Sequence, residues 1–285
     1  MNPDVPSVID HTRRGPTAPD AGAGDDQPAG VLRHTRLLAF RVGVLVVFFA
    51  AWWWSSGTLI DKFYLPAPLK VAQELAEWAG DGSLVRNILA TLIPGLKGFL
   101  IATAMAFVLG YALAMARFAS EVLEPYITAL YGVPIIALVP LLILWFGIGD
   151  ELAVSVAVLA SFFLMFYNVY FGIREVSRTL IDQVLIAGGS AWDIALRVRL
   201  PSALVWVAAG MKVAVPHSIV GVVVAEFLTG NRGIGFLLSS NANQFNAAGV
   251  FAAVIVLASM SFVLDRLLSL FTRRALMWKD ANRQP

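Results

Sequence analysis

The 285-residue chain has no cysteine, only three histidines and few charged residues. The lack of cysteine excludes disulfides, thiolate metal sites and cysteine nucleophiles. Charged side chains make up 14% of the residues, against about 25% in a typical soluble domain. Because 58% of the residues are hydrophobic and the mean hydropathy is +0.74, this composition indicates a protein embedded in a membrane.

Several chemical motifs are also missing. The sequence has no GxxxxGK[ST] phosphate loop, no HExxH pair and no nucleophile elbow. The segment GNRGIG at 230–235 matches a dinucleotide fingerprint only superficially, because no predicted strand precedes it. We therefore expect no catalytic residue, cofactor or metal site in this chain, and no nucleic-acid partner.

Apolar residues gather instead in six runs, each about as long as the ~20 residues that cross a bilayer core. None alternates polar and apolar residues as a membrane β-strand does, so we expect helices. The runs cover residues 37–56, 88–116, 123–148, 152–173, 203–228 and 248–271. The fold class predicted is all-α, a polytopic membrane protein with six transmembrane helices.

The predicted domain organisation follows these runs. Residues 1–33 are rich in proline and are interpreted as a disordered cytoplasmic tail. Residues 34–278 form the six-helix domain, with a cytoplasmic loop at about 180–202, and residues 279–285 form a second cytoplasmic tail. The outer segment 57–87 contains either a short interfacial helix after its prolines or a loop that covers the helix ends.

The positive charges predict the orientation. With both termini in the cytoplasm, fourteen of the 21 lysines and arginines lie on the cytoplasmic side and four lie outside. Cytoplasmic loops of membrane proteins carry this excess. We therefore expect a multi-pass protein of a bacterial plasma (inner) membrane with both termini cytoplasmic.

The stretch LIDQVLIAGGSAWDIALRVRLPSAL at 180–204 interrupts the apolar pattern with polar residues. Gly188 and the glycine after it predict a sharp turn. Ser190 with Asp193 three residues later forms a capping-box pattern that starts a helix. This helix is expected to be short, because Pro201 fits only the first turn of the next helix.

The short helix is amphipathic, and two interpretations are open. One is a helix resting on the lipid surface before the chain re-enters the membrane. The other is a docking helix whose exposed face, with Trp192, inserts into a cytoplasmic partner. The apolar stripe consists of Ala191, Ile194, Ala195 and Val198.

This stretch resembles the EAA signature of binding-protein-dependent ABC importer permeases, in which a glycine lies thirteen residues before a proline preceded by leucine. Gly188 and Leu200-Pro201 have this spacing. The stretches VPIIALVPLLILWFGIGDE at 133–151 and GVVVAEFLTGNRGIGFLL at 221–238 are similar to the nitrate, sulfonate and taurine branch. The opening Glu-Ala-Ala is replaced by Asp182-Gln183-Val184, so the first carboxylate has a shorter arm.

The resemblance implies a type I ABC importer permease in which the loop is the coupling helix. Two permease copies, as a homodimer, would form the pathway, two ATPase subunits would bind ATP and Mg below it, and a periplasmic or surface-anchored binding protein would deliver the cargo. The implied cargo is a small anion such as a sulfonate, taurine or nitrate. Bicarbonate, a pyrimidine or thiamine precursor and an aromatic carboxylate remain alternatives. The implied ATPase-coupling residues are Asp182, Gly188, Gly189, Ser190, Ala191, Trp192, Asp193 and Pro201.

Four residues in the spans are candidates for the translocation pathway. Pro134 and Pro140 break the third span. Either the freed carbonyl groups face a cavity and the span lines the pathway, or the span only packs in the helix bundle. His217 lies mid-span and either lines the pathway or bonds to a neighbouring helix as a neutral group. Glu226 ends the same span and either lines the pathway or pairs with Arg232 to fix the outer loop.

Two rival functions are weighed against the permease. An ion-coupled secondary transporter needs a coupling-ion site at mid-membrane, and no acidic residue lies at the centre of a predicted span. An integral membrane enzyme needs catalytic side chains clustered at one membrane face, and the sequence offers no such cluster.

Overall fold

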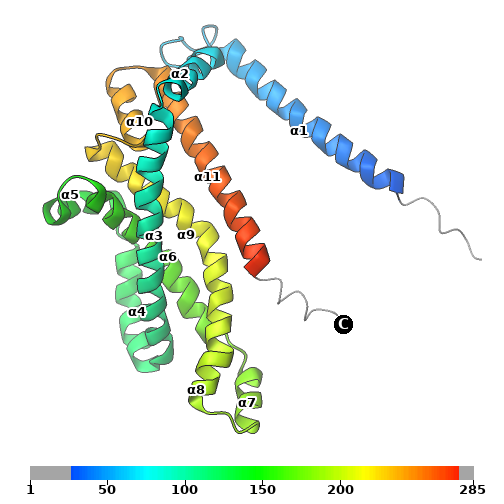
Figure 1. The fold of residues 1–285 in the computed structure, drawn as a ribbon, viewed down its shortest axis with the longest axis vertical. Coiled ribbons are helices and arrows are strands. Elements are labelled where there is room, and N and C mark those ends of the chain that lie inside the picture. The colour runs from blue at the N-terminus through cyan, green and yellow to red at the C-terminus, as the bar shows by residue number, and fades with distance from the viewer. Residues whose placement is uncertain (1–26, 276–285) are drawn as a thin grey trace, which may run out of the picture. The chain divides into compact units, whose positions relative to one another are not determined.

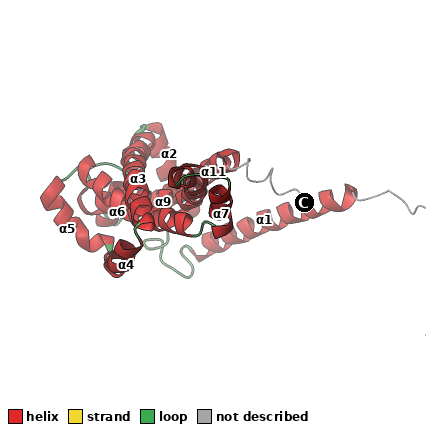
Figure 2. Ribbon diagram, turned by 90° about the horizontal axis from the view of Figure 1, so that it is seen from below, coloured by secondary structure: helices red, strands yellow, loops and turns green. Residues whose placement is uncertain are grey.

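The computed structural model describes residues 27–275, which are helical throughout except for short connections (Figure 2). The described residues divide into two compact units, 27–51 and 52–275. The helices are α1 (Gln27–Ser55), α2 (Pro68–Gly80), α3 (Ser83–Met115), α4 (Arg117–Tyr131), α5 (Ile135–Phe146), α6 (Asp150–Arg174), α7 (Arg178–Ile186), α8 (Ala191–Ile194), the π-helix η1 (Ala195–Arg199), α9 (Leu200–Thr229), α10 (Ile234–Asn243) and α11 (Ala247–Ala275).

The predicted tails fall mostly outside the described residues. Helix α1 begins at Gln27, earlier than the boundary expected at residue 33. Pro28 lies in its first turn, where a missing N–H leaves no intrahelical bond unmade. The rest of the N-terminal tail and the C-terminal tail at 279–285 lie outside residues 27–275.

The six predicted spans are recovered in part. Four helical stretches of the described chain are long and apolar enough to cross a membrane, Ser83–Met115, Asp150–Arg174, Ala191–Asn243 and Ala247–Thr272. The first predicted span corresponds to a shorter apolar helix, Ala39–Ser55, whose length of about 25 Å is less than a bilayer core of about 30 Å. The predicted class of helical membrane protein is therefore confirmed, but the number of six membrane spans is not established.

The third predicted span, 123–148, is not one continuous helix. It consists of α4 and α5, which meet at an angle of 92°. Gly132 ends α4, and Pro134 takes an extended conformation before the first turn of α5. The residue before a proline is disfavoured in helical geometry, so the chain turns at 132–134. Pro140 lies inside α5 and does not end it.

Helices α3, α6 and α9 run side by side and form the centre of the bundle (Figure 1). Their contacts use small residues. In α3 a buried row at four-residue spacing consists of Gly98, Ala102, Ala106 and Gly110. Small side chains let helix backbones approach closely in a membrane, where apolar burial alone does not favour one helix over lipid.

The outer segment contains a helix, as one of the two interpretations expected. In α2, Val71 and Trp78 are buried and pack with Ile234 of α10 and with α11. Asp81 then begins α3 by accepting the N–H of Ser83 at 2.8 Å. Hydrogen bonds from the Ser83 hydroxyl and N–H lower the pKa of the Asp81 carboxyl below its usual range.

We predict that Gly98→Val destabilises the bundle. An added Cβ at Gly98 would lie 2.5 Å from the Cβ of Ala157 and 2.9 Å from the carbonyl oxygen of Val154. Overpacking of this kind costs about 1–3 kcal/mol, so the thermal unfolding midpoint in detergent should fall. Gly80→Val is the control, because nothing lies within 4 Å of a Cβ added there. Equal midpoints for the two variants would contradict the close α3–α6 contact.

Candidate functional site

The predicted turn after α7 is confirmed. Gly188 has a φ of +78°, in the left-handed region. Its N–H donates to the carbonyl oxygen of Leu185 at 3.0 Å, and the N–H of Gly189 donates to that of Val184 at 2.8 Å. These two bonds form a Schellman motif, the usual end of a helix at glycine. The pair of glycines thus stops α7 and redirects the chain into α8.

The capping box at Ser190 is also confirmed. The N–H of Asp193 donates to Oγ of Ser190 at 3.3 Å, and the N–H of Ser190 donates to Oδ2 of Asp193 at 2.9 Å. Asp193 additionally pairs with Arg197 at 3.3 Å, one turn later. The start of this helix is therefore fixed by reciprocal hydrogen bonds before any partner is present.

The short helix does not end at a break before Pro201. Pro201 lies in the first turn of α9, as predicted, but the helical backbone is continuous from α8 through η1 into α9. The N–H of Leu200 reaches back five residues to the carbonyl oxygen of Ala195. A π-helical turn widens the helix there and accommodates a proline without interrupting it. The short helix that begins at Ala191 is consequently continuous with the span that follows.

The segment presents apolar side chains at one end of the bundle, where Figure 1 places α7 and α8. Trp192 is 71% exposed and Ile186 is 87% exposed. Asp182 is also exposed, and Asp182 makes no ion pair within the described residues. Of the predicted stripe, Ile194 and Ala195 are buried, Val198 is half-buried and Ala191 is exposed.

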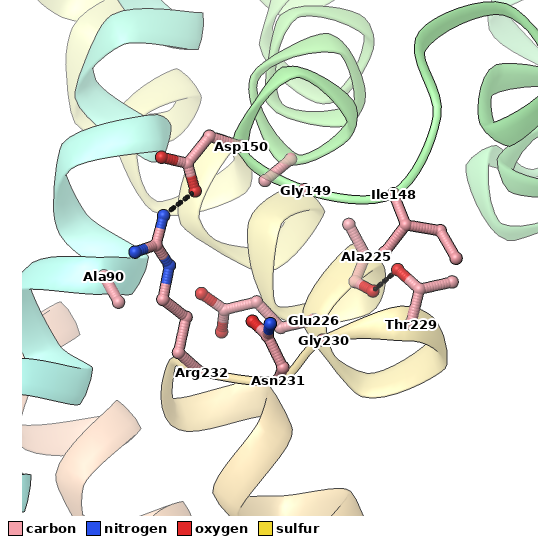
Figure 3. Close-up of a pocket in the computed structure, with 11 residues that line it drawn as sticks. Ala90, Ile148, Gly149, Asp150, Ala225, Glu226, Thr229, Gly230, Asn231 and Arg232 are labelled. Atoms are coloured by element: carbon pink, nitrogen blue, oxygen red, sulfur yellow. Dashed lines mark hydrogen bonds and ion pairs between the residues drawn. The ribbon is translucent and has the colours of Figure 1, made fainter.

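A second candidate region lies at the opposite end of α9, around a cavity of about 430 Å³ (Figure 3). Arg232 lines it and pairs with Asp150 at the start of α6, at 2.7 Å. The expected pairing of Glu226 with Arg232 is therefore not formed, because the guanidinium is directed to Asp150. The cavity is lined by Ala90, Ile148, Gly149, Asp150, Ala153, Ala225, Glu226, Thr229, Gly230, Asn231 and Arg232.

Glu226 holds the first turn of α10. Its side chain is only 7% exposed. Both carboxylate oxygens accept the hydroxyl of Thr91 at 2.9 Å, and Oε2 accepts the N–H of Gly235 at 2.9 Å. Thr91 in turn accepts the N–H of Ile234 at 2.9 Å. A carboxylate at a helix N-terminus compensates free N–H groups and the helix dipole.

The sequence analysis did not predict the hydrogen-bond acceptors that α3 supplies to the start of α10. Asn87 accepts the N–H of Gly233 at 2.7 Å, and Thr91 lies one turn further along the same face. Both side chains are buried, at 5% and 0% exposure. The sequence did contain a signal for these acceptors. Asn87 and Thr91 are two polar residues four positions apart in an apolar run, and they lie on the helix face that continues with Gly98. An added Cβ at Gly233 would meet the Glu226 carboxylate, which explains a glycine there.

The remaining predicted pathway residues are not gathered around this cavity. His217 is exposed, and its Nδ1 lies 2.9 Å from the carbonyl oxygen of Val213 in the same helix. The alternative of a bond to a neighbouring helix is therefore not seen in the described chain. Pro134 lies just before α5 and Pro140 lies inside it. Helix α5 contacts α6 through Val139. Residues 27–275 contain no group of three or more potential metal-binding side chains.

We predict that Glu226→Ala lowers the stability of the protein in detergent. The variant leaves the N–H of Gly235 and the Thr91 hydroxyl without their acceptor in a buried place. Such an unsatisfied group costs about 1–3 kcal/mol, which a thermal unfolding midpoint measures. Glu121→Ala is the matched control: its pair with Arg117 is exposed, and such pairs contribute about 0–1 kcal/mol. A shift no larger than that of the control would show that the network does not stabilise the fold.

Comparison with known proteins assigns the chain to a family. Residues 82–276 match the family model described as binding-protein-dependent transport system inner membrane component. The chain is 32% identical over 236 residues to the riboflavin transport system permease protein RibX of Chloroflexus aurantiacus, covering 83% of this chain and 87% of the relative. It is 27% identical over 218 residues to the putative aliphatic sulfonates transport permease protein SsuC of Bacillus subtilis, covering 76% and 79%.

Solved structures agree on the fold. A chain of the MetNI methionine ABC transporter in an inward-facing conformation superposes with a TM-score of 0.57 at 17% identity, over 70% of this chain and 97% of that chain. A chain of an amino acid ABC transporter crystallised with histidines gives a TM-score of 0.57 at 16% identity, over the same shares. The chain therefore belongs to the binding-protein-dependent inner membrane component family and is an ABC importer permease.

Proposed function

We propose that this chain forms the translocation pathway of an ATP-driven importer for a small anion delivered by a binding protein. The observation that supports it most directly is the segment at 186–194. It is a helix start fixed by internal hydrogen bonds, yet it presents Ile186 and Trp192 to its surroundings. Exposed apolar side chains mark a site of protein or membrane contact, and the resemblance of this stretch to the EAA signature favours a protein partner.

In this proposal there are two ATPase subunits, which would bind ATP and Mg. One docks on the segment at 186–194 of each permease copy. Two copies of this chain form a homodimer around the pathway. The charge distribution supports an orientation with α7 and α8 in the cytoplasm and the Glu226 cavity at the outer face. A binding protein, periplasmic or surface-anchored, would then meet the chain near α2 and α10.

The proposed cargo class rests on the relatives and on the sequence motifs. A sulfonate permease is among the relatives, and the stretches at 133–151 and 221–238 are similar to its branch. RibX and the formylaminopyrimidine permease ThiX of Halalkalibacterium halodurans, 29% identical over 206 residues, support an aromatic or pyrimidine cargo as the second candidate. Uptake measured with labelled taurine, nitrate and a pyrimidine precursor separates these classes.

Ion-coupled transport is disfavoured by the position of the acidic groups. Glu226 is a buried carboxylate of the described spans, and its oxygens are occupied by Thr91 and Gly235. It therefore serves the first turn of α10 rather than an open ion site. Asp150, which lines the same cavity, is paired with Arg232.

We predict that Trp192→Glu abolishes co-purification of the ATPase subunits and ATP-dependent uptake, while the permease still reaches the membrane. A charged side chain cannot fill an apolar pocket without a large desolvation cost. Trp192→Phe is the matched control, because it keeps an aromatic ring at the same exposed position and should retain both properties. The measurements are pull-down from detergent and uptake in cells.

Gly188→Asp provides an independent test of the same interface. A side chain at position 188 would be strained in the left-handed backbone conformation, which would destabilise the turn that orients α8. ATPase binding should therefore fall at unchanged expression. If Trp192→Glu and Gly188→Asp both leave ATPase binding and uptake intact, the proposed docking segment is wrong.

A further inference from the structure

A pocket rich in arginine lies beside the docking segment, where spans α3 and α6 end. Its volume is about 440 Å³. Four arginines line it, and the one carboxylate among its lining residues is Asp182. The arginines come from four different elements and are Arg117 of α4, Arg174 of α6, Arg178 of α7 and Arg199 of η1.

Three of the four arginines have no ion-pair partner in the described chain. Arg174, Arg178 and Arg199 have no carboxylate within ion-pair distance in the described chain, and only Arg117 is paired, with Glu121. Like charges that line one pocket repel each other, and a bound anion would relieve this repulsion. Guanidinium groups bind phosphate in a two-pronged geometry that lysine lacks.

Two buried polar side chains orient the site. Nη1 of Arg174 donates to the hydroxyl of Ser120 at 2.8 Å and to the hydroxyl of Tyr170. The guanidinium lies 5.3 Å from the centre of the Tyr170 ring. Ser120 is 0% exposed and Tyr170 is 3% exposed. Arginine has five N–H donors, so this anchoring leaves donors free for a ligand while fixing the direction of the group.

Arg199 is positioned from the other side. Its Nη1 lies against the sulfur of Met115, the last residue of α3. Both residues line the pocket, so the π-helical turn and the end of α3 meet at its wall. A bound anion would bridge α6, α7 and η1 at the base of the docking segment.

The depth and surroundings of the pocket favour a lipid. It lies at the ends of two spans, the level at which phospholipid phosphates are found. Phe118 follows the lining residue Arg117 in the chain and is 82% exposed, and Phe171 lies three residues before Arg174 and is 42% exposed; apolar side chains of this kind can contact acyl chains. We propose that this pocket binds a phosphate-bearing anion, with the head group of an acidic phospholipid as the source that its depth favours.

The pocket itself does not depend on the proposed transport function. That function decides only the leaflet, which is cytoplasmic in the proposed orientation. A lipid bridging α6, α7 and η1 would make the rigidity of the docking segment sensitive to membrane composition.

The test is native mass spectrometry of the delipidated full-length chain in detergent, titrated with phosphatidylglycerol or with phosphatidylcholine. Wild type should bind phosphatidylglycerol more tightly. The variant Arg178→Gln/Arg199→Gln should lose about fivefold in affinity for each arginine replaced, because a basic residue contributes about 1 kcal/mol near an anionic lipid surface. Phosphatidylcholine binding should not change.

The control variant is Arg197→Gln/Arg266→Gln, which removes the same charge outside the pocket. It should keep the affinity of wild type for phosphatidylglycerol. An equal loss in both double variants, or no preference of wild type for phosphatidylglycerol, would overturn the proposal. Because the wild-type titration needs no variant, a misfolded variant would not leave the question open.

Two further additions identify the source of the anion. Inorganic phosphate that displaces phosphatidylglycerol from wild type would assign the site to soluble phosphate-bearing anions, whereas persistent lipid binding would assign it to the head group. Both results support an anion site. If adding the ATPase subunits expels the lipid, the arginines belong to the ATPase interface and the lipid proposal fails.

Discussion

Close contact between the backbones of α3, α6 and α9 is the constraint on which the rest of the structure depends. In a bilayer, lipid solvates an apolar side chain as well as another helix does, so packing has to be tighter than lipid contact to be favoured. The row from Gly98 to Gly110 in α3 provides that contact on α6, where an added Cβ would meet backbone atoms. Polar groups can then be placed at both ends of the bundle, because its centre is held without them.

The two ends of the bundle use polar residues differently. At the Glu226 end, the carboxylate accepts the Thr91 hydroxyl, and Glu226, Thr91 and Asn87 each accept one of the N–H groups at the start of α10. The opposite end is only locally satisfied: the capping box fixes α8, while Trp192 remains exposed. A buried and complete network suits an element that must keep its shape. An ordered surface with exposed apolar groups suits one that awaits a partner, as the family membership implies.

Local features were readable from the sequence, and long-range ones were not. The glycine turn and the capping box depend on residues within six positions of one another, so Gly188 and Ser190 were predicted correctly. The partner of Glu226 lies 135 positions away in the sequence, and no local pattern distinguishes Thr91 from Arg232 as that partner. The sharp bend at Pro134 was only partly readable, since proline predicts a kink but its angle depends on how α5 packs against α6. The exposure of a residue such as His217 depends on neighbouring helices in the same way.

Continuity of the helix through η1 has a mechanical consequence. Helix α9 has 30 residues, about 45 Å of helix, and α8 joins it without a break. In the proposed transporter, a movement imposed at Trp192 would pass along this helix, through the interior Pro216, toward Glu226, which holds α10. Had Pro201 separated the two, a movement of the docking segment could be absorbed by a flexible joint. In the proposed transporter, ATP binding would favour one orientation of this single lever over another, and the outer end would follow because its hydrogen bonds leave α10 no independent position.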